Sequence, residues 1–172
     1  MVKILVIDDD RDLCRIISDI LEEKGYIVST AYDGKSALSK IKTQKFNLVI
    51  LDYKLSGLNG LSSGLGVLEA LRQINPHLIT IMISAYGTES VRLKAKELGA
   101  YAFLDKPFNI NELIRVVKRA LREQKRRCVN GTDLQSRDSG SSSSGCGPSY
   151  FSSGENSNNP ANSLRDSKSL VS

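Results

Sequence analysis

The stretch Phe46-Asn47-Leu48-Val49-Ile50-Leu51-Asp52 decides the fold of this chain. Its four consecutive apolar residues, bounded by polar ones, are typical of a strand that is buried on both faces of a parallel sheet. Asp52 follows at the point where this strand leaves the sheet, at its carboxyl end. Because open α/β sheets bind their ligands just outside the carboxyl ends of their strands, Asp52 is a candidate site residue.

A second apolar run, 3–7, ends in the same way, in Asp8-Asp9-Asp10. If the two strands are neighbours, at least three carboxylates converge on one small volume. Such a cluster repels itself unless protons or a hard cation neutralise it. Aspartate is also a common turn former and helix cap, so a purely structural role is the alternative for these residues.

The chain up to about residue 122 alternates predicted strands with predicted helices. Further apolar runs predict strands at 26–30, 78–83 and 100–104. Apolar residues between the runs recur at helical spacing, and in the first such segment they are Leu13, Ile16, Ile17, Ile20 and Leu21. Five strands alternating with helices predict an α/β domain whose parallel sheet is covered by helices on both faces.

The segment from Leu55 to Gly66 contains four glycines and nearly repeats itself, as LSGLNG followed by LSSGLG. Because glycine disfavours helix, we expect a mobile loop here. A short helix is expected only from Val67 onward, ending before Asn75-Pro76.

Composition separates a folded part, residues 1–124, from a tail, residues 125–172. The folded part holds 18 Lys and Arg against 15 Asp and Glu, a balance that argues against direct nucleic-acid binding. The tail is rich in Ser, Gly and Asn, so we expect it to be disordered.

No apolar run is long enough for a signal peptide or for a membrane span of ~20 residues, so we expect a cytoplasmic protein. The cysteines do not have the spacing of zinc ligands or of a disulfide framework; they are Cys14, Cys128 and Cys146.

Polar side chains follow four of the five predicted strands: Asp8 and Asp9, Asp52, Ser84, and Lys106. This set suits the transfer of a phosphoryl group to an aspartate. One carboxylate acts as the nucleophile, and the others hold a divalent cation that neutralises phosphate charge. The hydroxyl and the ammonium group then bind the remaining phosphoryl oxygens.

Four short motifs stand in order at these strand ends: Ile7-Asp8-Asp9, Leu51-Asp52, Ile83-Ser84-Ala85 and Asp105-Lys106-Pro107-Phe108. In these motifs the chain resembles the response-regulator receiver domains of two-component signalling, notably those of nitrogen-regulation-type activators and sporulation phosphorelay proteins. The resemblance covers residues 2 to about 122. It implies a flavodoxin-like doubly wound sheet of five parallel strands in the order 2-1-3-4-5. It also implies a signalling switch and not an enzyme that turns over an external substrate.

Carried over residue by residue, the resemblance implies that Asp52 takes a phosphoryl group from the phosphohistidine of a sensor histidine kinase or a phosphotransfer protein. Asp9, Asp52 and the main-chain carbonyl of Lys54 would ligate Mg²⁺, and Asp8 would orient a water molecule on the metal. The resemblance also suggests a second copy of the chain as a partner, in a dimer that forms upon phosphorylation.

The same resemblance assigns the groups that surround the phosphoryl group after transfer. Ser84 would bond to one phosphoryl oxygen and Lys106 to another. Phe103 occupies the aromatic switch position of the family, and an ordinary core role is the alternative for it. In this family the peptide bond before the proline is typically cis, which here is Lys106–Pro107.

The loop after the acceptor aspartate departs from the family pattern. Ser56 stands where the family commonly has proline, and the loop is longer than usual, so either Gly60 or Gly64 fills the family's glycine position. By resemblance, Lys54 and Tyr86 border the path by which water reaches the phosphoryl group. Shielding by these two side chains predicts slow loss of phosphate.

Other classes of protein share parts of this pattern. An aspartate-nucleophile phosphohydrolase of the haloacid dehalogenase type needs Thr or Val where Arg11 stands. A calcium loop at Asp8, Asp10 and Asp12 fails because Leu13 stands where the sharp turn needs glycine. A flavodoxin-like site for FMN fails because three aspartates would repel its phosphate. The remaining alternative is the receiver fragment of a truncated transcription activator.

Overall fold

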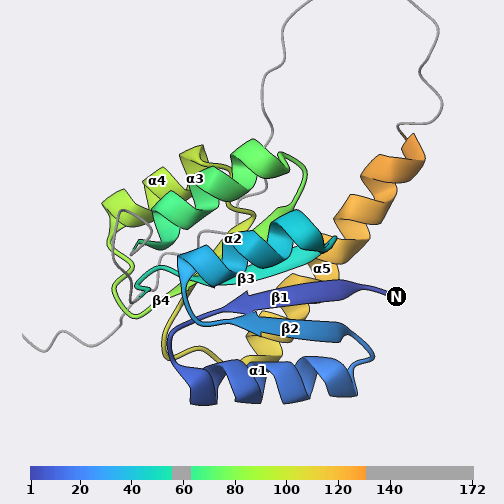
Figure 1. Cartoon of the computed structure of the whole chain (residues 1–172), viewed down its shortest axis with the longest axis horizontal. Coiled ribbons are helices and arrows are strands. Elements are labelled where there is room, and N and C mark those ends of the chain that lie inside the picture. Colours follow the sequence, from blue (N-terminus) through green and yellow to red (C-terminus); the bar gives the residue numbers. More distant parts are fainter. Residues whose placement is uncertain (56–62, 131–172) are drawn as a thin grey trace, which may run out of the picture.

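The structure, a computed structural model, describes residues 1–55 and 63–130. Strands and helices alternate along the chain (Figure 1), with bounds β1 Lys3–Ile7, α1 Arg11–Glu23, β2 Ile27–Ala31, α2 Gly34–Thr43, β3 Leu48–Asp52, α3 Gly64–Ile74, β4 Ile79–Ser84, α4 Glu89–Glu97, β5 Ala102–Asp105 and α5 Ile110–Asn130. In the described ranges the strands form a five-stranded sheet in the order β2-β1-β3-β4-β5, and each neighbouring pair is parallel. The doubly wound, flavodoxin-like fold is therefore confirmed.

Helices cover both faces of the sheet, α1 and α5 on one side and α2, α3 and α4 on the other (Figure 1). Because successive side chains of a strand point to opposite faces, each strand contributes to two cores. Val49 and Leu51 of β3 pack with α2, α3 and α4, whereas Leu48 and Ile50 pack with α1 and α5. All residues of β3 are buried, which confirms the central strand predicted from its apolar run.

Helix α1 begins where the acidic run after β1 ends. The carboxylate of Asp10 accepts hydrogen bonds from the backbone N–H groups of Asp12 and Leu13, so this aspartate caps the helix. The buried residues of the helix are Cys14, Ile17 and Leu21. Ile16, expected on the same face, is 52% exposed, because it lies a quarter turn away from the buried stripe.

Helix α3 begins earlier than the glycine content predicts. It starts at Gly64, so the expectation of a loop up to Gly66 is wrong for its last three residues. The hydroxyl of Ser63 caps the helix by accepting a hydrogen bond from the N–H of Leu65 at 3.3 Å. Burial of Val67 and other apolar residues against the sheet offsets the low helix propensity of glycine.

Helix α5 continues past residue 124, and its C-terminal turns project beyond the sheet (Figure 1). The prediction of a disordered tail from residue 125 onward is therefore wrong for residues 125–130, which continue the helix. The rest of the predicted tail, 131–172, lies outside the described residues. Among the helices of the described part of the chain, none has both the length and the apolar character needed to cross a membrane.

Candidate functional site

The parallel sheet brings the carboxyl ends of β1, β3, β4 and β5 to one edge. Asp52 is the last residue of β3, and Ser84 is the last residue of β4. Asp8 directly follows β1, and Lys106 directly follows β5. The side chains predicted from the sequence thus come from four strands to one place.

Asp8, Asp9 and Asp52 form an acidic cluster. Each offers a carboxylate oxygen, and these oxygens all lie within 4.8 Å of one another. Asp8 and Asp52 are buried, whereas Asp9 is exposed to solvent. Carboxylate oxygens are ligands that Mg²⁺ prefers, and a divalent cation offsets the repulsion among the charges. The donor set of the acidic cluster therefore fits a magnesium ion.

The ammonium group of Lys106 lies between the two buried carboxylates. Its Nζ is 2.7 Å from Oδ2 of Asp8 and 2.6 Å from Oδ1 of Asp52. The other oxygen of each carboxylate accepts a backbone hydrogen bond, Asp8 from the N–H of Asp10 at 3.0 Å and Asp52 from the N–H of Lys54 at 2.6 Å. Both carboxylates are therefore held in defined orientations.

The charges of this site are coupled. Burial raises the pKa of the Asp52 carboxyl and the charge of Asp8 adds to the rise, although the hydrogen bond from Lys106 opposes it. Burial alone would lower the pKa of Lys106, but its hydrogen bonds to Asp52 and Asp8 outweigh burial and raise it. Lys106 therefore stays charged at physiological pH. One ammonium group facing several carboxylates leaves the site with the negative charge that a cation site needs.

Ser84 is buried at the edge of the same site. Its hydroxyl accepts a hydrogen bond from the N–H of Tyr86 at 2.9 Å, and its carbonyl accepts one from the N–H of Lys106 at 2.7 Å. The Lys106–Pro107 peptide bond that follows is cis, as the resemblance implies. These backbone contacts thus hold the segment that carries the Ser84 hydroxyl beside the segment that carries Lys106.

The loop after Asp52 returns to the strand end at Gly64. The N–H of Gly64 donates a hydrogen bond to the carbonyl of Tyr53 at 2.6 Å. A Cβ at Gly64 would overlap the carbonyl oxygen of Asp52 and lie 2.8 Å from Cα of Tyr53, so the close approach requires glycine. Gly64, one of the two glycines considered for the family position, thus lies against Asp52. Gly60 lies outside the described residues, as does Ser56.

Replacing Gly64 with alanine is expected to lower the free energy of unfolding by about 1–3 kcal/mol, because the added methyl group forces the backbone beside Asp52 to move. Gly66→Ala, two positions further along α3, is the control. At that position alanine should leave stability unchanged or raise it by up to about 1 kcal/mol. Urea denaturation measures both variants, and equal stability of Gly64→Ala and the wild type would contradict the close approach.

Lys54 and Tyr86 lie on the solvent side of the site. The Nζ of Lys54 is 5.2 Å from the centroid of the Tyr86 ring, a cation–π contact. Tyr86 is 64% exposed, yet the two side chains contact each other and do not point separately into solvent. This contact joins the loop after β3 to the loop after β4.

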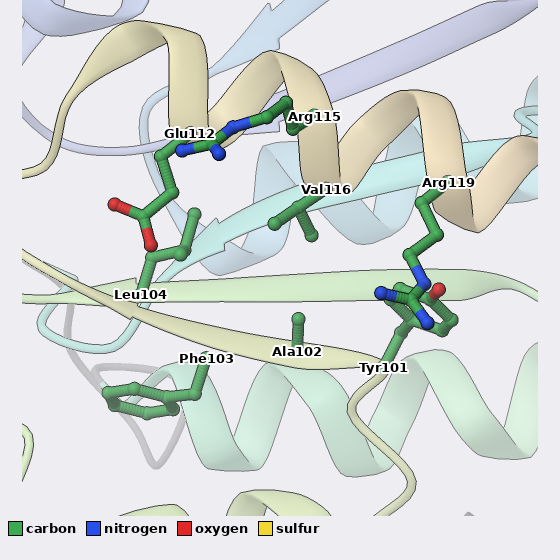
Figure 2. A pocket seen from close by; sticks show the side chains of 8 residues that line it. All are labelled: Tyr101, Ala102, Phe103, Leu104, Glu112, Arg115, Val116 and Arg119. Carbon is green, nitrogen blue, oxygen red and sulfur yellow. The ribbon is translucent and has the colours of Figure 1, made fainter. Parts of the chain in front are cut away.

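Phe103 is 1% exposed and packs in the same core as α3 and α4. In Figure 2 its ring points to the side of β5 opposite to that of Leu104. A cavity of about 330 Å³ borders β5 and α5 and is lined by Tyr101, Ala102, Phe103, Leu104, Glu112, Arg115, Val116 and Arg119 (Figure 2). Apart from Phe103, this cavity shares no residue with the predicted phosphoryl site.

Arg92 is a buried residue of α4 that forms an ion pair with Asp105, and no motif of the sequence indicates this role. The spacing of Val91 and Ala95 marks the buried face of this helix, and Arg92 lies next to that face in the sequence. Its place beside Val91 is the one feature of the sequence that indicates burial of Arg92. The residue type indicates the opposite, because arginine is usually exposed.

Comparison with known proteins gives a family for the chain. Residues 4–118 match the response regulator receiver domain. The nitrogen assimilation regulatory protein NtrX of Azorhizobium caulinodans is 36% identical over 118 residues, which cover 69% of this chain and 26% of that protein. The transcriptional regulatory protein CpxR of Escherichia coli is 37% identical over 137 residues, which cover 77% of this chain and 56% of that protein. The chain thus spans between about a quarter and just over half of the length of these relatives.

A solved structure supports the same assignment. The CheY-like response regulator receiver domain protein of Methanospirillum hungatei superimposes with a TM-score of 0.70 at 31% sequence identity, over 74% of this chain and 98% of that one. The family match runs from β1 into α5, so it includes every strand end that contributes to the site. The chain belongs to the response regulator receiver domain family.

Proposed function

We propose that the chain is a phosphoaccepting switch of a two-component system or phosphorelay, in which Asp52 receives a phosphoryl group. The observation that carries the proposal is the position of the Asp52 carboxylate, which lies in the acidic cluster and contacts Lys106 at 2.6 Å. The donor is the phosphohistidine of a sensor histidine kinase or of a phosphotransfer protein.

In the transfer, a carboxylate oxygen of Asp52 attacks the phosphorus atom. An O–P bond forms, and the P–N bond to the partner's histidine breaks with its electron pair staying on the imidazole. Lys106 and the hydroxyl of Ser84 then bind phosphoryl oxygens. Lys106 already contacts Asp52, so only a small movement of its ammonium group is needed.

In this proposal the acidic cluster would hold Mg²⁺. Asp9, Asp52 and the main-chain carbonyl of Lys54 would be its ligands, and Asp8 would orient a water molecule of the ion. The bound ion supplies charge neutralisation for the phosphoryl oxygens. The exposed position of Asp9 supports this assignment, because a ligand at the surface leaves a path for the ion to enter.

The output of the switch is also a proposal. NtrX and CpxR are named as regulators of nitrogen assimilation and of transcription, which supports a role for this chain as the receiver part of a transcription activator. A phosphorelay protein that passes its phosphoryl group onward is the second candidate. In both cases we propose that it acts in the cytoplasm, turns over no external substrate and forms a dimer when phosphorylated.

Incubation with acetyl phosphate and Mg²⁺ tests the proposed function. We expect intact-mass spectrometry to show the gain of one base-labile phosphoryl group, and we expect EDTA to prevent this gain. A protein that gains no phosphoryl group from acetyl phosphate or from phosphorylated histidine kinases would contradict the proposal.

We further propose that Lys54 and Tyr86, which by resemblance border the approach of water to Asp52, make the phosphorylated state long-lived. The contact between the two side chains supports this proposal. The variant Lys54→Asn/Tyr86→Glu should lose phosphate roughly tenfold faster, which corresponds to about 1.4 kcal/mol in the barrier. Tyr86→Phe keeps the aromatic ring and should decay as the wild type does. The decay of radiolabelled protein after removal of the donor measures the rates, and an unchanged rate in the double variant would show that these residues are not the shield.

A further inference from the structure

The positive charge of the chain is concentrated on α5. The whole chain carries a formal net charge of +5. Helix α5 alone holds seven Lys and Arg residues against two Glu residues, so its own net charge is also +5. The remainder of the chain holds 17 Lys and Arg against 17 Asp and Glu and is therefore neutral. The near balance of charge over residues 1–124, which argues against nucleic-acid binding, thus averages over an uneven distribution.

Five of these cations lie on one face of α5. At 3.6 residues per turn they fall within an arc of about 100° on the exposed side of the helix. Leu113, Val117 and Leu121, on the other side, are buried against the sheet. Both glutamates of α5 lie outside the arc, and one of them, Glu123, forms an ion pair with Arg119 at 3.1 Å. All members of this set are exposed, and we call it the α5 basic face: Arg115, Lys118, Arg122, Lys125 and Arg126.

The helix dipole does not account for the α5 basic face. A helix dipole favours cations only within the last turn, and the basic residue of the last turn of α5 is Arg127. Arg115 and Lys118 lie several turns before the end of the helix. Their place along α5 therefore needs another reason.

Ion pairing does not account for the α5 basic face either. Within residues 1–55 and 63–130, no acidic side chain forms a salt bridge with any of its members. Like charges four positions apart destabilise a helix, and Lys118, Arg122 and Arg126 repeat at this spacing. The α5 basic face thus lowers the stability of its own helix, a cost that a polyanionic partner would offset.

The residue types of the α5 basic face favour a nucleic acid over a lipid surface. Three of its five members are arginines, whose planar guanidinium groups bind phosphate through two hydrogen bonds. A helix that binds a lipid surface needs an exposed apolar face to insert. The apolar residues of α5 are instead packed in the core that α1 and the sheet share.

The shape of α5 suits a rigid duplex. From Arg115 to Arg126 the helix rises about 16 Å, and a DNA duplex carries one phosphate charge about every 1.7 Å along its axis. Several phosphates therefore lie within the length of the α5 basic face. The C-terminal turns of α5 also project beyond the sheet (Figure 1), which leaves them accessible to a large partner.

We propose that the α5 basic face binds the phosphate backbone of double-stranded DNA without reading its bases. A basic face along one helix is the electrostatic footprint of a nucleic-acid-binding surface. Each cation that contacts a phosphate releases a counterion, so the affinity falls steeply with salt. The inference is independent of the proposed function, because no residue of the predicted phosphoryl site lies on α5.

The test measures binding of the full chain to a fluorescein-labelled duplex of about 20 base pairs by fluorescence anisotropy, without a phosphoryl donor. At about 50 mM salt we expect a Kd in the micromolar range that is the same for duplexes of different sequence. The plot of log affinity against log salt concentration should have a slope of about −3 to −4, which corresponds to about four phosphate contacts. A wild-type protein that does not bind the duplex at this salt concentration would overturn the inference.

The decisive variant is Arg122→Gln/Lys125→Gln/Arg126→Gln, which removes three charges from exposed positions of the α5 basic face. It should bind the duplex at least roughly tenfold more weakly, and the salt slope should fall in magnitude by about 2–3. Arg122→Lys/Arg126→Lys keeps the charges and should bind within about threefold of the wild type. A Kd and a salt slope that do not change in the triple variant would overturn the inference.

A matched control separates the α5 basic face from net charge alone. Lys35→Gln/Lys42→Gln/Lys45→Gln removes the same number of charges from exposed positions of α2 and the loop after it. It should keep its Kd within about twofold of the wild type. If this control binds the duplex as weakly as the triple variant of α5 does, only the net charge of the chain matters and the inference fails.

Two further probes distinguish DNA from other anionic partners. Vesicles that contain phosphatidylserine should not sediment the protein at the salt concentration at which the duplex binds. Polyglutamate should displace the labelled duplex much less effectively than unlabelled duplex does at an equal concentration of charge. Sedimentation with the vesicles but no duplex binding would assign the α5 basic face to a membrane, and equal displacement by polyglutamate would assign it to an acidic protein. Either result would overturn the inference.

Discussion

Asp52→Asn is expected to abolish the labelling of the protein by acetyl phosphate. The amide has the same shape as the carboxylate but lacks the negative oxygen that attacks phosphorus. Burial already raises the pKa of the Asp52 carboxyl, and the charge of Asp8 adds to this. A neutral side chain should therefore be tolerated, and we expect the free energy of unfolding to stay within about 1 kcal/mol of the wild type, because the lost hydrogen bond to Lys106 and the relieved repulsion offset each other.

The control for this prediction is Asp19→Asn, an exposed position on α1, which should label at the wild-type rate. Intact-mass spectrometry over a time course distinguishes the three proteins. Undiminished labelling of Asp52→Asn would place the acceptor elsewhere, and Asp8 and Asp9 would be the next residues to replace. Lost labelling together with a large loss of stability would instead show that the Asn variant disturbs the fold.

The sequence predicted those parts of the fold that depend on local patterns. Strand β3 could be predicted because a strand buried on both faces has an uninterrupted apolar run, and β1 and β4 follow the same rule. The aspartates that follow β1 and end β3 could be assigned to one edge of the sheet, because all parallel strands end on the same side. Strand order is different: periodicity does not determine it, and the order 2-1-3-4-5 came from the resemblance alone.

The parts that could not be predicted depend on contacts between distant residues. Lys106 and Asp8 are 98 positions apart in the sequence, and nothing local to either residue shows that they form an ion pair. The burial of Arg92, a residue of α4, depends on Asp105 and Phe103 of β5. The start of α3 at Gly64 contradicts glycine propensity, because packing against the sheet determines that helix more strongly than local preference.

Lys106→Met is expected to lower the free energy of unfolding by about 3–5 kcal/mol at neutral pH in EDTA, the usual cost of removing one partner from buried ion pairs. Asp8 and Asp52 are only 1% and 3% exposed, and the Nζ of Lys106 contacts both of them. Methionine fills much of the space of the lysine stem but leaves two buried carboxylates without this cation. Lys45→Met, at an exposed position, is the control and should stay within about 0.5 kcal/mol of the wild type.

The stability lost in Lys106→Met should depend on pH. Burial already raises the pKa of Asp52 in the folded protein, and loss of the ammonium group raises it further. A carboxyl whose pKa is higher in the folded than in the unfolded state binds its proton more tightly when the protein is folded. Its ionisation therefore lowers the free energy of unfolding. This loss is complete above the folded pKa and disappears below the unfolded pKa of about 4. The difference from the wild type should therefore be largest at neutral pH and shrink toward about pH 4. A difference that does not change with pH would mean that lost packing, not charge, causes it.

Mg²⁺ should recover part of this loss, because a divalent cation in the acidic cluster replaces the missing positive charge. Millimolar Mg²⁺ is expected to raise the Tm of Lys106→Met by several degrees, and by more than that of the wild type, since Lys106 and Mg²⁺ compete for the same negative charge. Asp9→Ala removes the exposed carboxylate and should abolish the response to Mg²⁺, while the metal-free protein stays as stable as before or becomes more stable. If thermal melts in Mg²⁺ and in EDTA agree for the wild type and both variants, the acidic cluster is not a cation site. The lower free energy of unfolding of Lys106→Met would then come only from the lost ion pairs to the buried Asp8 and Asp52.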